Sequence, residues 1–114
     1  IAVVRQLLGP RLLRVYLASI IGVAHITIYL DDSFSLKDKR QVVRSITARV
    51  RNQFNAGIAE VADLDDMRVA TLGIVCISNQ GAHATEMLTT IIQFIERNLE
   101  LGAVGEIETE LIHV

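Results

Sequence analysis

The chain has 114 residues, 51% of them hydrophobic, with no tryptophan, one proline and a formal net charge of −2. These totals predict one globular domain with a single core and exclude an intrinsically disordered chain. The charge is uneven, because bases exceed acids over residues 1–54 and acids exceed bases over residues 55–114. A polyanion would therefore bind at one face only.

Residues 1–20 are apolar, carry three arginines and are broken by Gly9-Pro10. A membrane span over residues 12–30 is rejected, because Arg14 and His25 lie inside it and its second half alternates like a strand. A signal peptide is disfavoured, because cleavage would cut into that strand. We predict an N-terminal extension over residues 1–20 and one domain over residues 21–114.

Alternating apolar and polar residues predict a first strand over residues 22–30. Ser35 followed by Asp38 resembles a capping box, so a helix is expected from Leu36 to residues 52–55. Asn55-Ala56-Gly57 should close this helix, since these residues tolerate left-handed conformations. Its apolar side is formed by Leu36, Val43, Ile46, Val50 and Phe54.

The remaining pattern predicts strands over residues 58–63, 68–78 and 104–112, and a second helix over residues 82–98. This βαββαβ order indicates an α+β, ferredoxin-like fold, a four-stranded antiparallel sheet with both helices on one face and strand order 4-1-3-2. Glu106, Glu108 and Glu110 alternate with apolar residues, so the last strand should turn an acidic side to the uncovered face.

The first helix also carries a basic stripe. Lys37, Arg40, Arg44 and Arg51 fall within an arc of about 60° on a helical wheel. Cations in a first helical turn oppose the helix dipole by about 0.3–1 kcal/mol each, so helix stability alone does not account for them. The alternative is a solvated basic face. We predict a nucleic-acid or anion-binding site formed by Lys37, Lys39, Arg40, Arg44 and Arg51.

Nothing in the sequence predicts catalysis, a metal site or a cofactor. The three histidines lack ligand spacing, and Cys76, the single cysteine, lies in an apolar run that predicts a buried thiol and fits a cytoplasmic protein. Acylphosphatases share the predicted topology, but Asp31 and Asp32 occupy the place of their phosphate-binding loop. RNA recognition domains stack bases on aromatic residues of the central strands, where this chain offers only Tyr29.

Four strings carry a resemblance to a known family: SLKDKR at residues 35–40, FNAGIAEV at residues 54–61, ATLG at residues 70–73, and Ser78-Asn79 before His83. They resemble the YlxP-like family of small bacterial proteins of unknown function. The resemblance implies a ferredoxin-like fold. Through the family's gene neighbourhood it also implies a role near the ribosome, with ribosomal RNA or a ribosome-bound factor as partner. Residues 66–69 lack the aromatic residue that relatives often have there.

Two functions are favoured, and a phosphate-transfer enzyme is the third, disfavoured alternative. The first is a non-enzymatic accessory factor that binds RNA or the ribosome through the basic helix. The second is a homo-oligomeric interaction or small-ligand module that uses the uncovered sheet face, where Val23, Thr27 and Tyr29 give a partly apolar surface. In that case the partner is a second copy of the chain.

Overall fold

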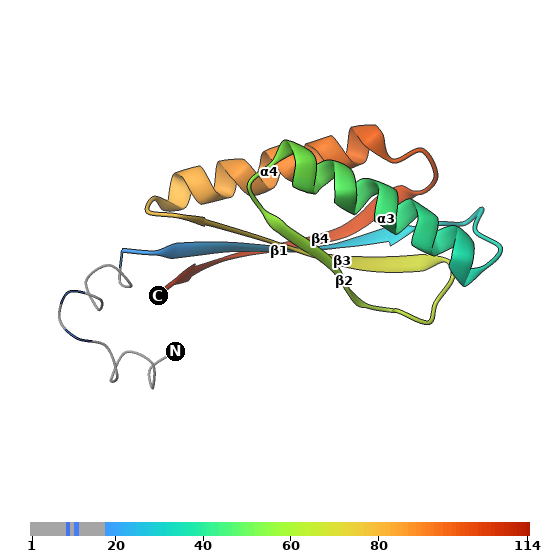
Figure 1. Cartoon of the computed structure of the whole chain (residues 1–114), viewed down its shortest axis with the longest axis horizontal. Helices are drawn as coiled ribbons and strands as arrows, with labels where there is room; N and C mark the ends of the chain where they lie inside the picture. The colour runs from blue at the N-terminus through green and yellow to red at the C-terminus, as the bar shows by residue number, and fades with distance from the viewer. Residues whose placement is uncertain (1–8, 10, 12–17) are drawn as a thin grey trace.

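The computed structural model describes residues 9, 11 and 18–114 of the chain. The elements are β1 (Ile20–Tyr29), α3 (Leu36–Gln53), β2 (Gly57–Ala62), β3 (Val69–Ser78), α4 (Gly81–Asn98) and β4 (Ala103–His113) (Figure 1). The predicted βαββαβ order is confirmed. Most of the predicted extension over residues 1–20 lies outside the described residues, but Ile20 already belongs to β1.

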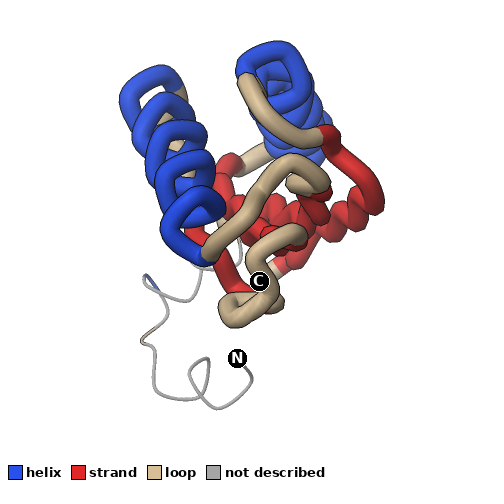
Figure 2. Tube along the Cα trace, turned by 90° about the vertical axis from the view of Figure 1, so that its right-hand side faces the viewer, coloured by secondary structure: helices blue, strands red, loops and turns tan. Residues whose placement is uncertain are grey.

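The four strands form one antiparallel sheet in the order β2-β3-β1-β4. Both helices lie on the same side of this sheet (Figures 1 and 2). Helix α4 packs on β1 and β3, while α3 packs on β2 and against α4. This is the α+β, ferredoxin-like arrangement that the sequence predicts, and it leaves the other sheet face uncovered.

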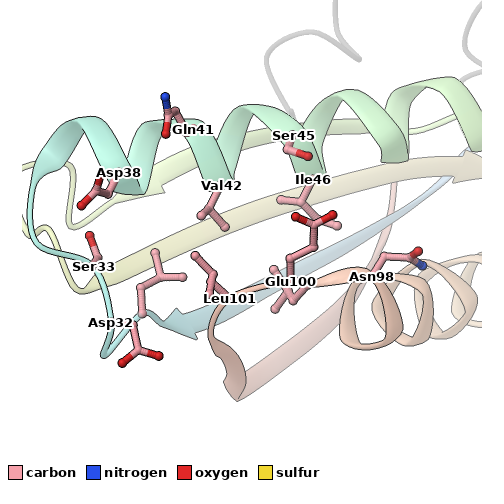
Figure 3. A pocket seen from close by; sticks show the side chains of 12 residues that line it. Asp32, Ser33, Asp38, Gln41, Val42, Ser45, Ile46, Asn98, Glu100 and Leu101 are labelled. Carbon is pink, nitrogen blue, oxygen red and sulfur yellow. The ribbon is translucent and has the colours of Figure 1, made fainter.

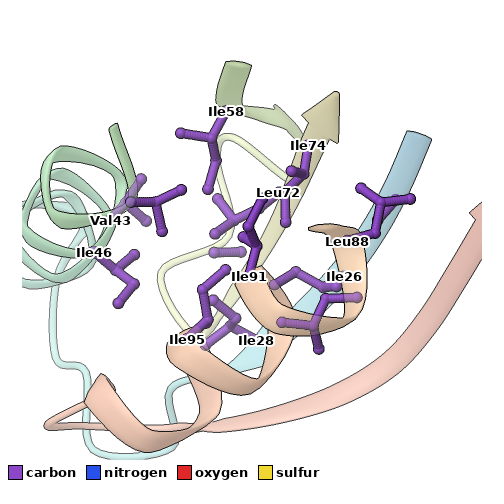
Figure 4. Packing of buried hydrophobic residues seen from close by; sticks show 14 of the residues in the cluster. Ile26, Ile28, Val43, Ile46, Ile58, Leu72, Ile74, Leu88, Ile91 and Ile95 are labelled. Carbon is purple, nitrogen blue, oxygen red and sulfur yellow. The ribbon is translucent and has the colours of Figure 1, made fainter. Parts of the chain in front are cut away.

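The core fills the space between the helices and the sheet (Figure 4). Each strand of the central pair turns alternate side chains toward the helices, as the period of two requires. Each helix contributes one apolar stripe at helical spacing. The largest fully buried apolar side chains are Ile26, Ile28, Leu30, Val50, Leu72, Ile74, Leu88, Ile91 and Ile95.

The start of α3 matches its predicted cap, and its end does not. The Asp38 backbone N–H donates to Ser35 Oγ at 3.0 Å, and the Asp38 carboxylate accepts from the Phe34 backbone N–H at 3.0 Å. At the other end, Phe54 caps the helix in an extended conformation, and Gly57 is the first residue of β2. The predicted left-handed closure at residues 55–57 is therefore wrong.

A glycine is required where the chain turns from α4 into β4. Gly102 has φ of 98°, in the left-handed region. A Cβ at this position would lie 2.7 Å from the carbonyl oxygen of Tyr29. A residue with a side chain would therefore collide with the backbone of β1 and would also be strained at its own positive φ. Gly102 thereby fixes the course of the segment that connects α4 to β4.

Candidate anion-binding surface

Three cations of the predicted site lie together on the solvent side of α3. Lys37, Arg40 and Arg44 are exposed, and within the described part of the chain none of their side chains takes part in a hydrogen bond or an ion pair. They span about 10 Å along the helix axis. We call these three residues the basic edge of α3.

Lys39 does not belong to this surface, which corrects the prediction. Its side chain is 0% exposed, and Nζ lies 2.7, 3.3 and 3.1 Å from the carbonyl oxygens of Asp63, Leu64 and Val69. Glu60 Oε2 lies 2.8 Å away. An ammonium group has three protons, so the three carbonyls take the hydrogen bonds and Glu60 supplies the opposite charge. No external anion can reach Lys39.

The β2–β3 turn is shaped to hold this ammonium group. Asp63 has φ of 59°, its carbonyl also accepts from the Asp66 backbone N–H at 3.0 Å, and its carboxylate accepts from Thr71 Oγ1 at 2.6 Å. A register shift between Glu60 and Ala62 lies next to the turn. The loop therefore folds back so that its carbonyls converge on Lys39.

Two further arginines of α3 have internal partners. Arg51, the fourth residue of the predicted stripe, is exposed but donates from Nη2 to the carbonyl oxygen of Ile58 at 2.8 Å. Arg49, which the prediction did not include, donates to Oδ1 of Asn98 at 2.6 Å and its guanidinium lies 5.9 Å from the Phe94 ring centroid. These contacts join α3 to β2 and to α4, so both arginines help to place the helix.

A pocket of about 400 Å³ lies on the other flank of α3, beside the segment that leads from α4 to β4 (Figure 3). Apolar residues and three acids line it, and no basic residue does. Its carboxylates would repel a phosphate group, so the basic edge of α3 and the pocket are separate features. The apolar lining residues are Leu30, Val42, Ile46, Leu99 and Leu101, and the acids are Asp32, Asp38 and Glu100.

The uncovered sheet face has an apolar end and an acidic edge. Ile77, Ile21 and Ile112 lie side by side on β3, β1 and β4, and Ile77 is 63% exposed. Glu108 and Glu110 occupy the β4 edge of this face, paired in register with His25 and Val23. The predicted acidic side of the last strand is therefore confirmed.

Tyr29 and Glu106 form a hydrogen bond across that face. The Tyr29 hydroxyl donates to Glu106 Oε2 at 2.6 Å. This bond raises the pKa of Tyr29 and lowers the pKa of Glu106, because it is made with the protonated phenol and the ionised carboxylate. The hydroxyl of Tyr29 is thus engaged by a carboxylate, which makes this ring a poor platform for RNA.

The described residues contain few groups suited to catalysis. They include no cluster of three His, Cys, Asp or Glu side chains that could hold a metal ion. Cys76 is buried and free, as predicted, and burial raises the pKa of its thiol, which keeps it protonated and unreactive. Among these same residues, no helix is both long enough and apolar enough to cross a bilayer.

Comparison with known proteins places the chain in a family of unknown function. A family model described as a protein of unknown function, DUF503, matches residues 21–107, and the chain belongs to this family. It is also 33% identical over 76 residues to the uncharacterized protein YlxP of Bacillus subtilis strain 168, an alignment that covers 67% of this chain and 83% of the relative. The YlxP-like resemblance is thereby confirmed.

One solved structure of similar shape is a designed protein. The de novo designed protein Foldit4 superposes with a TM-score of 0.48 at 10% sequence identity, covering 82% of this chain and 96% of that one. A likeness at this level carries no argument about function.

Proposed function

We propose that this protein is a non-enzymatic cytoplasmic accessory factor that binds ribosomal RNA through the basic edge of α3. The observation that supports this is the absence of any internal partner for Lys37, Arg40 and Arg44 among the described residues. Lys37 and Arg40 lie near the start of the helix, where cations oppose the dipole. A phosphate group would remove this conflict.

The surroundings restrict how an RNA strand can approach. The acidic pocket lies along one flank of α3, and the acidic edge of β4 lies on the opposite face of the sheet. Both would repel phosphates, so a strand must follow the basic edge. Three phosphate contacts predict a slope of log affinity against log salt of about −2 to −3.

The test compares variants that remove charge from α3 and from α4. Changing Lys37, Arg40 and Arg44 together to Gln should weaken binding to purified ribosomal RNA by about tenfold or more at low salt and flatten the salt dependence. Arg40→Gln alone should reduce the slope by about 0.7–0.9, whereas Arg97→Gln, an exposed cation on α4, should leave it unchanged. Binding that the triple change leaves intact would refute the proposal.

We propose a homodimer through the uncovered sheet face as the second candidate, because the Ile77, Ile21 and Ile112 row is apolar across three strands. A two-fold axis parallel to the strands would lay the acidic β4 edge of one copy over β2 of the other. On this face β2 presents Ala59 and no acid, since Glu60 points to Lys39. Charge therefore permits this pairing.

Light scattering over a range of protein concentrations tests the dimer directly. A dimer that Ile77→Lys converts to a monomer, with no loss of helical circular dichroism, would support it, because the side chain is mostly solvent-exposed in a single copy. A monomer at the highest concentration would refute it.

A further inference from the structure

The residue before the cap of α3 presents an aromatic ring to solvent. Phe34 is 77% exposed, the largest exposure among the large hydrophobic side chains of the described residues. Within this part of the chain its ring has no aromatic or cation–π partner. A phenylalanine this open to water contributes little to folding, so its exposure calls for a physical cause.

The cause lies in the residue with which it would normally pack. The position before a helix cap often packs against the fourth helical residue, as a hydrophobic staple. Counted from the cap Ser35, that fourth residue is Lys39, whose side chain runs inward to the carbonyls of the β2–β3 turn. The staple is therefore absent, and the Phe34 ring remains outside.

The backbone of Phe34 is nevertheless held in place. Its N–H donates to the Asp38 carboxylate at 3.0 Å, and Ser35 next to it caps the helix. The preceding residue is held as well, because Ser33 Oγ donates to the carbonyl oxygen of Ser35 at 3.0 Å. The ring is thus presented from an ordered loop, which reduces the entropy lost when a ligand packs on it.

This ring adjoins the basic edge of α3. Three peptide units separate Phe34 from Lys37, so their Cα atoms are at most about 11 Å apart. In single-stranded nucleic acid each base has a phosphate beside it, and proteins that bind such strands combine stacking aromatic rings with nearby cations. A duplex hides the faces of its bases, so it could use the cations but not the ring.

We propose that the RNA bound by the basic edge of α3 is single-stranded, with one base stacked on Phe34 and the following phosphates on Lys37 and Arg40. This inference rests on the proposed function and specifies its ligand. Stacking tolerates any base, so the site should show little sequence preference. A protein partner on Phe34 is the competing occupant, and it becomes an outcome of the test.

The first measurement uses affinity for an oligouridylate of about 10 nucleotides and for an RNA duplex of the same length, a size within the range of single-strand sites. Phe34→Leu should weaken single-strand binding by about 5- to 150-fold and leave duplex binding unchanged. Phe34→Tyr, which keeps a ring, should retain affinity. The control Leu64→Ala removes another exposed apolar side chain, in the β2–β3 turn, and should change neither.

The second measurement uses the absence of tryptophan from the chain. Phe34→Trp creates a single tryptophan at the proposed stacking position, and its emission should be quenched by the oligonucleotide but not by the duplex. Because Phe34 is exposed, these variants should keep the fold, and circular dichroism checks this.

The outcomes separate this inference from the proposed function. If Phe34→Leu leaves single-strand binding unchanged while the triple cation variant weakens it, stacking is refuted and RNA binding stands. If neither the oligouridylate nor the duplex shows salt-dependent binding, the proposed function is refuted, and this inference is refuted with it. If Phe34→Leu weakens ribosome association but not oligonucleotide binding, the ring contacts a protein, which also refutes the stacking.

Discussion

Two lysines of α3, two residues apart, have opposite environments. Lys39 is buried among three carbonyls and Glu60, whereas Lys37 is exposed and, among the described residues, without a partner. Both lie in the first turns, where the helix dipole disfavours a cation. The structure supplies the compensating negative groups for one lysine only. Charge near a helix start therefore marks a site for a ligand only after internal acceptors have been excluded.

The largest expected loss of stability comes from replacing Lys39, the buried lysine of this pair. Lys39→Met keeps a side chain of nearly the same length but removes the ammonium group, leaving the converging carbonyls without their donor and Glu60 without its opposite charge. Removing one member of a buried ion pair costs about 3–5 kcal/mol. Urea denaturation should show a loss of that size, with disorder centred on the β2–β3 turn. A loss below about 1 kcal/mol would mean that the lysine does not fasten the turn.

A smaller loss of stability is expected from replacing Glu60, the partner of Lys39 in the ion pair. Glu60→Gln keeps the shape and removes the charge, while the three carbonyls still hold Lys39, so the loss of unfolding free energy should be about 1–3 kcal/mol. The double change Lys39→Met with Glu60→Gln should cost less than the sum of the two single changes, because the groups contact each other. Strict additivity would contradict the ion pair.

The fold could be predicted from the sequence because its signals are local and repeat along each element. The alternation in residues 22–30 and the helical spacing in residues 36–53 and 82–98 determine which side of each element is buried. The order of the elements then leaves one familiar antiparallel arrangement. The closure of α3 was predicted wrongly, because residues that tolerate a left-handed conformation do not require one, and packing selected an extended Phe54.

The site could be predicted only in part, because a basic stripe does not reveal which cations have partners. The position of Lys37, Arg40 and Arg44 on one side of α3 can be predicted from the local sequence alone. The carbonyls that hold Lys39 come from a turn more than twenty residues away, which no local pattern reveals. One signal was available: on a helical wheel Lys39 falls in the middle of the apolar side, between Val43 and Ile46. The exposure of Phe34 follows from the same fact.

A moderate loss of stability is expected from changes at Ser35, the N-cap of α3. Ser35→Ala removes the oxygen that accepts from the Asp38 N–H and should lower the unfolding free energy by about 1 kcal/mol. Ser35→Gly should cost only a few tenths of a kcal/mol, because glycine is a tolerated cap. Faster amide hydrogen exchange confined to the first turn of α3 would locate the effect. Equal losses for both variants would contradict capping as the cause.

The smallest expected effect is a gain in stability, and it comes from replacing Lys37, the exposed lysine of the pair. Lys37→Gln removes a cation near the positive end of the helix dipole at nearly equal helix propensity, so it should raise the unfolding free energy by about 0.3–1 kcal/mol at low salt. Arg97→Gln is the matched control. Arg97 lies in the last turn of α4, where a cation is favourable, so its removal should lower stability by a similar amount.

Both changes in stability should shrink at high salt, since exposed charges are screened. Thermal denaturation at low and high ionic strength measures all four values. A loss of stability in Lys37→Gln would reveal an internal partner for Lys37, and the contrast between Lys37 and Lys39 would then disappear. A gain in stability that accompanies weaker RNA binding would show instead that this lysine disfavours the free fold and is compensated only when an anion binds.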